Sequence, residues 1–165
     1  MAGKRTPAVA VVEQAGVPYR LHEYALDPTA PSFGLEAASK LDLDPARVFK
    51  TLVVATGEGN LLALVPADAR LDTKALGKRA RLAEPAEAER VTGYVKGGTS
   101  ALGGRKRLPV VLDESALAWE TIVVNAGRRG LQLELAPSDL LALTGGRVAR
   151  LVAGSPDQGP FRTGL

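Results

Sequence analysis

Residues 48–65 read VFKTLVVATGEGNLLALV, and they contain a strong β-hairpin signal. Val48 to Ala55 is an apolar, β-branched run that a single charge, Lys50, interrupts. Residues 57–60, Gly-Glu-Gly-Asn, have the composition of a tight turn. Leu61 to Val65 is then the expected return strand. The stretch therefore predicts a hairpin whose first strand is almost wholly apolar.

Signals on both sides of this hairpin predict further helices and strands. Helices are expected at 7–15, 35–41 and 72–79, after Pro85, and from Pro137 to about 145, with at most one turn at 115–118. Strands are expected at 18–24, 109–112, 121–124 and 131–135. Strands in the middle with helices at the ends and between hairpins favour the α+β class with a mixed sheet.

The length of 165 residues predicts a single domain, which we place at residues 1–154. Residues 155–165 are rich in Pro, Gly and polar residues and are expected to form a flexible C-terminal tail. No apolar run approaches a membrane span, and the N-terminus lacks a secretion signal. We therefore expect a cytoplasmic protein with no membrane partner.

Composition excludes several kinds of chemistry. The chain has no cysteine, which rules out thiol nucleophiles and Cys-based metal sites, and its one histidine, His22, cannot form a two-histidine site. We expect no metal and no cofactor. No serine has a local partner that marks it as a nucleophile, and we interpret His22 as a strand residue with a satisfied hydrogen bond.

Positive charge is concentrated in the middle of the chain. Residues 70–107 contain ten basic and four acidic residues, whereas the whole chain carries a net charge of only +3. This distribution suits a polyanion such as RNA, with no DNA partner expected, although a solvated surface with counter-ions explains it as well. The aromatic content of 4% argues against a base-stacking platform.

Lys50 is the first candidate functional residue. Alternation along the strand places it on the face of Leu52 and Val54, opposite Phe49 and Thr51. Such a lysine either protects an exposed edge strand or binds an anion or a carbonyl oxygen. Binding needs no pKa shift, whereas a lysine that acts as a base near pH 7 needs extensive desolvation.

Two loops are further candidates. Residues 97–104, Gly-Gly-Thr-Ser-Ala-Leu-Gly-Gly, allow backbone N–H groups to approach an anion or a developing oxyanion, or form a plain turn. Residues 125–130, Asn-Ala-Gly-Arg-Arg-Gly, predict a tight turn with Arg128 and Arg129 at its tip. The two arginines there are suited to phosphate, or belong to an ordinary hairpin.

These segments, in this order, resemble the YbaK/EbsC family of aminoacyl-tRNA deacylases, also called Cys-tRNA(Pro) deacylases. The matching residues are Thr6-Pro7-Ala8, Phe33-Gly34 with Glu36-Ala37-Ala38, Phe49 to Leu52, Gly93 to Ser100 with Gly103, Gly127 to Leu131, and Leu135-Ala136-Pro137 with Asp139-Leu140. The resemblance runs from about residue 6 to residue 152.

The resemblance implies a barrel-like mixed β-sheet flanked by helices, of the type of the prolyl-tRNA synthetase editing domain. It implies a trans-editing deacylase that removes mischarged amino acid, above all cysteine, from tRNA(Pro). Such a second site is needed because a single pocket discriminates small side chains by only about 1–3 kcal/mol. The family is thought to let the substrate supply the attacking group, a cysteine thiol or water assisted by a ribose hydroxyl, so the enzyme is a hydrolase, or a lyase if cysteine cyclises.

The resemblance also assigns roles to individual residues. Lys50 matches the essential lysine, and Gly97 and Gly98 match the loop that approaches the scissile ester. Phe33 and Thr51 match pocket-lining positions, and Tyr24 is a weaker match. We expect these three residues, with Thr99, Ser100 and Asn125, to bind the substrate. From their charge and position we expect the tRNA-binding residues to be Arg105, Lys106, Arg107, Arg128 and Arg129. The sequence departs from the family pattern at two positions. Asn125 replaces a serine of some relatives, and Ala101, in the glycine-rich loop, replaces a proline of many members.

Two other functions remain open at this point. The chain could be a non-catalytic module that binds tRNA or a synthetase, which predicts salt-dependent tRNA binding without ester cleavage. It could also be a regulator that binds a small molecule in the same pocket. Few base-reading residues are visible, so for the deacylase we expect prolyl-tRNA synthetase as a candidate partner that supplies tRNA selectivity.

Overall fold

The computed structural model describes residues 5–153, and the expected tail at 155–165 lies outside them. Its elements are α1 (Pro7–Ala15), β1 (Arg20–Glu23), α2 (Phe33–Lys40), β2 (Val48–Thr56), β3 (Gly59–Pro66), η2 (Thr73–Leu76), β4 (Arg81–Leu82), α3 (Pro85–Thr92), β5 (Val110–Asp113), η3 (Glu114–Ala118), β6 (Ile122–Arg128), β7 (Leu131–Leu135), α4 (Pro137–Thr144) and β8 (Arg147–Ala149).

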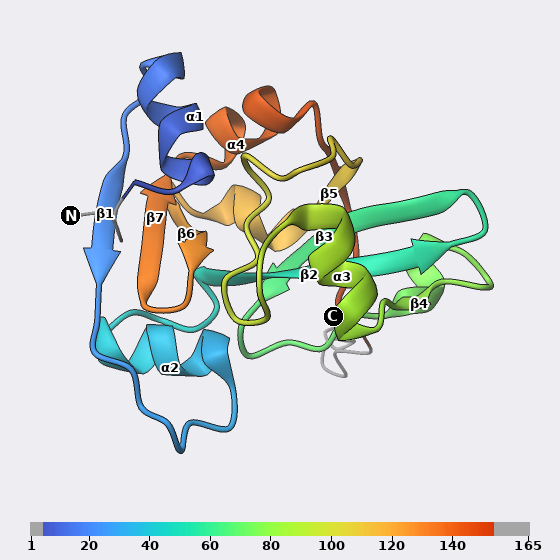
Figure 1. The fold of residues 1–165 in the computed structure, drawn as a ribbon, viewed down its shortest axis with the longest axis horizontal. Helices are drawn as coiled ribbons and strands as arrows, with labels where there is room; N and C mark the ends of the chain where they lie inside the picture. Colours follow the sequence, from blue (N-terminus) through green and yellow to red (C-terminus); the bar gives the residue numbers. More distant parts are fainter. Residues whose placement is uncertain (1–4, 154–165) are drawn as a thin grey trace, which may run out of the picture.

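The strands form one mixed sheet in the order β1-β7-β6-β2-β3-β5-β8, with β4 paired to β2 (Figure 1). β2 and β3 are the predicted antiparallel hairpin. Parallel pairs join β2 to β6, β3 to β5 and β5 to β8, while β1, β6 and β7 pair antiparallel. The predicted mixed α/β class is confirmed, and the expected hairpin lies at the centre of the sheet.

The strand β2 has neighbours on both sides. β3 pairs with it from Phe49 to Thr56. On its other side β6 pairs only at Val48 and Phe49, and β4 pairs only at Val54 and Ala55. The edge-strand interpretation of Lys50 is therefore wrong, because β2 is an internal strand. The side of β2 between β6 and β4 is nevertheless left without a partner strand, and the candidate site lies there.

Apolar side chains pack on both faces of the sheet. As predicted, Phe49 and Val53 share one cluster, which also includes buried residues of α1, α3 and α4. Val54 belongs to a second cluster on the opposite face, with Leu52 packed against it. α2 packs separately, through Ala37 and Ala38. Figure 1 shows α2 below the β1–β7–β6 end of the sheet and α3 in front of β2 and β3.

Two local predictions are wrong, and two short strands were not predicted. The expected helix at 72–79 is only the 3₁₀ turn η2, because Gly77 leaves the helical region at φ 136° and ψ 156°. The expected turn at 125–130 is shorter, since β6 continues through a bulge to Arg128. β4 and β8 have only two and three residues, too few for a visible alternation.

Candidate active site

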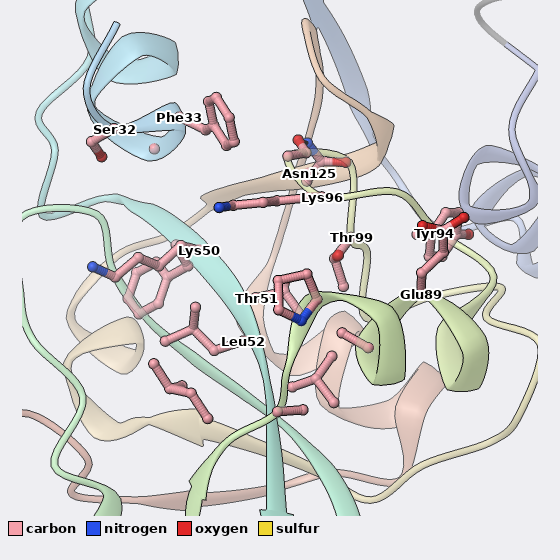
Figure 2. A pocket seen from close by; sticks show the side chains of 18 of the residues that line it. Ser32, Phe33, Lys50, Thr51, Leu52, Glu89, Tyr94, Lys96, Thr99 and Asn125 are labelled. Carbon is pink, nitrogen blue, oxygen red and sulfur yellow. Dashed lines mark hydrogen bonds between the residues drawn. The ribbon is translucent and has the colours of Figure 1, made fainter.

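A cavity of about 380 Å³ opens at the gap between β6 and β4 (Figure 2). Its floor is the unpaired side of β2, from Val48 to Val53. Phe33 of α2 lies at one wall, and α3 with the segment before it contributes Leu82, Ala83 and Pro85 at another. The loop that follows α3 forms a third wall through Gly97 and Thr99. Elements far apart in sequence therefore meet around one strand.

Lys50 is half-buried in this cavity and participates in no ion pair among residues 5–153. Burial lowers the pKa of its ammonium group, and the charge of Asp68 partly opposes that effect. The amine therefore lacks a fixed counter-ion among the residues that the structure describes. In Figure 2 its side chain and that of Lys96 end on the same side of the pocket, below Ser32 and Phe33.

Thr51 presents unsatisfied polar groups at the floor of the pocket. Its Oγ1 is buried and has no hydrogen-bond partner among the residues described. The backbone N–H of Ala83 donates to the carbonyl of Val53 at 2.9 Å, so the peptide groups of Val53 point away from β3. Peptide groups two residues apart in a strand point to the same side. The backbone N–H and carbonyl of Thr51 therefore also point away from β3, into the gap between β6 and β4. The pocket floor therefore has groups available to a ligand.

The two predicted glycines have different environments. Gly97 lines the pocket at φ +89°, and within residues 5–153 its N–H has no hydrogen-bond partner. The side-chain amide of Asn125 donates to the Gly97 carbonyl at 2.9 Å. The N–H of Gly98 instead donates to the Val95 carbonyl, and a Cβ there would lie 2.7 Å from the Cα of Arg128. Gly97 can thus donate to a ligand, whereas Gly98 allows close packing.

The pocket contains Phe33, Lys50, Thr51, Gly97, Thr99 and Asn125 of the predicted set. Tyr24 is not among the residues that line the pocket, and burial, followed by the charge of Glu36, raises the pKa of its hydroxyl group. Ser100 is buried, accepts the Leu102 N–H at 3.2 Å and lines a second cavity of about 230 Å³. The structure therefore brings together six of the predicted substrate-site residues and separates Ser100 from them.

The predicted tRNA-binding arginines and lysine fall into two groups. Arg105, Lys106 and Arg107 are exposed on the far part of the glycine-rich loop, and the last two line the second cavity. Arg128 is ion-paired to Glu23 at 2.6 Å, and Arg129 to the buried Glu36 at 2.8 Å. The first group is free to meet a polyanion, whereas acidic residues already neutralise the second.

Sequence reasoning missed other pocket residues. Lys96 was counted only in the overall charge, although it directly precedes the glycine pair. Gln132 lies opposite Asn125 in the β6–β7 ladder, so the two amides line the pocket as a cross-strand pair. Alternation along each strand could have put both amides on one face, but only if the register had been known.

The described residues contain no nucleophile–base pair at the pocket. The only histidine, His22, is hydrogen-bonded to Glu134, with 2.7 Å between Nε2 and Oε1, so the expected satisfied hydrogen bond is confirmed. Residues 5–153 contain no group of three or more His, Asp or Glu that could hold a metal ion. None of their helices has the length and hydropathy that crossing a membrane requires. Among the described residues the site offers cations, a peptide N–H without a partner and a hydroxyl without a partner.

Comparison with known proteins identifies the class. A profile of the aminoacyl-tRNA editing domain matches residues 28–143, which include the whole pocket. The chain therefore belongs to the aminoacyl-tRNA editing domain family. Its class of activity is that of the editing deacylases, which act on aminoacyl-tRNA.

Individual relatives are similar over most of the chain. One, from Enterococcus faecalis strain V583, is provisionally named a Cys-tRNA(Pro)/Cys-tRNA(Cys) deacylase, EbsC; it is 37% identical over 90% of this chain and 93% of its own. A crystal structure provisionally described as a trans-editing enzyme for prolyl-tRNA synthetase is 30% identical, with a TM-score of 0.77 over 90% of this chain and 96% of its own. The hypothetical protein APE2540 is 27% identical, with a TM-score of 0.78 over 88% and 99%.

Proposed function

We propose that this protein hydrolyses cysteine from mischarged tRNA(Pro), with Lys50 anchoring the aminoacyl-adenosine end and the Gly97 N–H stabilising the developing oxyanion. The observation that carries the proposal is one pocket with an unpaired, half-buried ammonium group in its floor and an unpartnered glycine N–H in its wall. The similarity to the Enterococcus faecalis protein supports the choice of substrate.

Lys50 acts in this proposal through its charge. Its ammonium group interacts with phosphate or carbonyl oxygens of the terminal nucleotide and fixes the position of the ester. Burial strengthens this interaction because water no longer screens it fully. Positioning of this kind can lower a barrier by several kcal/mol, roughly up to 10 in well-oriented systems.

The attacking group comes from the substrate. The sulfur of the bound cysteine forms a bond to its own ester carbonyl carbon, and the carbon–oxygen bond to the ribose breaks. The electron pair stays on the ribose oxygen, which takes up the proton that the thiol releases. The four-membered cyclic thioester then adds water to give free cysteine. For alanine, water attacks directly with help from the free ribose hydroxyl. Neither route needs a protein base, and the pocket contains no histidine or cysteine.

The negative charge that develops on the carbonyl oxygen needs a donor already in place. The N–H of Gly97 suits this role because the Asn125 amide fixes the peptide carbonyl of the same residue. A single preorganised donor of this kind is typically worth about 3–4 kcal/mol in rate. Thr51 Oγ1 is a second polar group that the bound amino acid can satisfy.

Arg105, Lys106 and Arg107 are proposed to contact the tRNA backbone. They are exposed, and they belong to the same loop as the pocket residue Gly97. Contacts of this kind bind phosphate without reading sequence. We therefore propose that prolyl-tRNA synthetase delivers the tRNA and supplies selectivity for it.

The test is deacylation of Cys-, Ala- and Pro-charged tRNA(Pro) by the purified protein. We expect the cysteinyl ester to be lost fastest and the prolyl ester to survive. Cysteinyl-tRNA with its thiol blocked by alkylation distinguishes the two routes, since only the thiol route needs the free sulfur. The rival function, a binding module without catalysis, requires tRNA binding with no loss of any ester.

A further inference from the structure

A buried ion pair joins two walls of the pocket. Glu36 on α2 has a side chain that is 1% exposed, and Arg129 in the β6–β7 turn has one that is 23% exposed. Nη2 and Nε of Arg129 donate to the same carboxylate oxygen at 2.8 and 3.0 Å. The other carboxylate oxygen accepts the backbone N–H of Asp27. Arg129 Nη2 also donates to the Asp27 carbonyl at 2.8 Å, which ties the loop before α2 to the same pair.

This pair determines where Phe33 lies. The guanidinium carbon of Arg129 is 4.4 Å from the centroid of the Phe33 ring, a cation–π distance. The same ring also lies close to the glycine loop: a Cβ on Gly97 would lie 3.1 Å from two Phe33 ring carbons and 3.5 Å from Arg129 Cδ. Arg129, Phe33 and Gly97 are therefore in mutual contact, and movement of one displaces the others.

A buried ion pair adds little net stability compared with apolar residues, because both charges lose their hydration. The main effect of such a pair is to fix geometry, because several hydrogen bonds hold the guanidinium group in one orientation. The donors of Arg129 that face Glu36 and Asp27 point into the protein, and Glu36 neutralises the charge. That arrangement suits a support for the pocket wall better than a contact with phosphate.

We propose that Glu36 and Arg129 are positioning residues of the editing site. By clamping Phe33 against Gly97, the pair holds the Gly97 N–H at a fixed distance from the ester that Lys50 anchors. This proposal rests on the proposed function. It replaces the role in tRNA binding that the sequence suggested for Arg129.

The decisive variant keeps the charge but loses the hydrogen-bond geometry of the pair. Arg129→Lys cannot donate from two nitrogens to one carboxylate oxygen and also reach the Asp27 carbonyl. Arg47→Lys is the matched control, because Arg47 forms a similar pair with Glu134, with exposures of 24% and 17%, that is outside the pocket. Glu36→Gln, which keeps the size of the side chain, is a second variant in case the first fails to fold.

For each variant we would measure kcat and KM on Cys-tRNA(Pro), the salt dependence of KM, the melting temperature and amide exchange of the peptide 93–104. Arg129→Lys and Glu36→Gln should lower kcat about 10- to 100-fold, as expected for a small displacement of a reacting group. KM and its salt dependence should change less than about twofold, and the 93–104 amides should exchange faster. Arg47→Lys should lose melting temperature without losing kcat.

An unchanged kcat in Arg129→Lys with normal loop exchange overturns the proposal. A raised KM with a shallower salt dependence in Arg129→Met also overturns it, because loss of a phosphate contact made by Arg129 would have that signature. If the wild-type protein cleaves no ester, the proposed function fails. In that case amide exchange of residues 93–104 is the test of the positioning role. Unchanged protection in both Arg129→Lys and Glu36→Gln refutes that role.

Discussion

Lys50 carries a charge that its surroundings only partly stabilise. Burial lowers the pKa of its ammonium group below the ordinary value of 10.5, and the nearby carboxylate of Asp68 compensates incompletely. A phosphate or carbonyl oxygen supplied by the substrate would therefore restore a favourable environment. The same residue that weakens the folded state at neutral pH thus strengthens binding.

The lowered pKa of Lys50 predicts a specific pH dependence. As the pH rises through the folded-state pKa, the ammonium group loses its proton and kcat/KM for Cys-tRNA(Pro) should fall, beginning below pH 10.5. In the interval between the folded and unfolded pKa values the unfolded chain binds more protons, so stability should rise slightly with pH. Rates corrected for spontaneous ester loss check the first effect. Lys50→Arg should remove the decline, and a decline that persists in this variant would contradict the assignment.

A methyl group at Gly97 should impair catalysis. The residue has φ +89°, and a Cβ would lie 3.1 Å from the Phe33 ring, so Gly97→Ala displaces the pocket wall. We expect kcat to fall about 10- to 100-fold. Gly59→Ala is the control, because Gly59 has φ +124° but nothing within 4 Å of the added carbon. Both variants should lose about 1–2 kcal/mol of stability from the left-handed backbone, and equal activity in the two would refute the role of Gly97.

At this scale the sequence predicted the candidate residues with short-range signals. Lys50 stands out as a charge in an apolar strand, and the glycine pair stands out by composition. The partnership of Glu36 with Arg129 could not be predicted, because the two lie 93 positions apart and either alone is an ordinary surface residue type. The position of Gln132 in the pocket could not be predicted either, because it depends on the register between β6 and β7.

Among the elements, β7 is anchored by a network around Glu134. Its carboxylate accepts hydrogen bonds from Arg47 at 2.6 Å and from Thr121 at 2.6 Å, and it contacts His22 of β1 at 2.7 Å. Burial opposes its ionisation, but the hydrogen bonds of Thr121 and His22 and the charge of Arg47 together lower the pKa of Glu134 below 4.5. The network thereby joins β1, β7 and the start of β2.

This network predicts acid sensitivity. A lowered carboxyl pKa contributes stability that is complete above the unfolded value and is lost as the pH falls through the folded value. Glu134→Gln should cost about 2 kcal/mol near neutral pH, less than a fully buried pair, and the deficit should shrink as the pH falls below 4.5. Urea unfolding at several pH values measures it. Glu13→Gln in the exposed Arg5–Glu13 pair should cost less than about 0.5 kcal/mol; an equal loss in both would contradict the network.

Elements with strong local patterns were predicted well. The helix α1 has a Thr6 cap, a proline at its first position and Gly16 at its end, and all three are observed. β4 was not predicted because a tertiary contact determines it, the bond from the Ala83 N–H to Val53 of β2. The helix expected at 72–79 is only the short turn η2, because Gly77 leaves the helical region. The gap between β6 and β4, which creates the pocket, is a property of the assembled sheet that no single segment encodes.

For the whole molecule, charge and fold together suggest how tRNA approaches. Arg105, Lys106 and Arg107 are exposed on the loop whose earlier part lines the pocket. Lys74, Lys78 and Arg79 are also exposed, but they belong to the segment around η2, which packs through Leu71 and Leu76 against the cluster of Val54 and is not part of the glycine-rich loop. The two sets of three basic side chains carry the same charge but belong to different segments of the chain.

Neutralising the first set should weaken tRNA binding. The variant with Arg105, Lys106 and Arg107 changed to Gln should raise KM and reduce the slope of log K against log salt by about two to three, close to one for each phosphate contact. The value of kcat should stay within about twofold of wild type. The matched Gln variant of Lys74, Lys78 and Arg79 should retain the wild-type slope. If both sets change the slope equally, RNA binding is diffuse rather than directed at the loop.

We propose that one pocket, with Lys50 in its floor, removes cysteine from tRNA(Pro). The most direct measurement is the single-turnover rate of Cys-tRNA(Pro) deacylation by wild-type protein and by Lys50→Ala, with melting curves to confirm that both are folded. We expect the rate to fall at least about 100-fold in the variant, because the substitution removes a group that orients the ester. Undiminished cleavage by folded Lys50→Ala would contradict it.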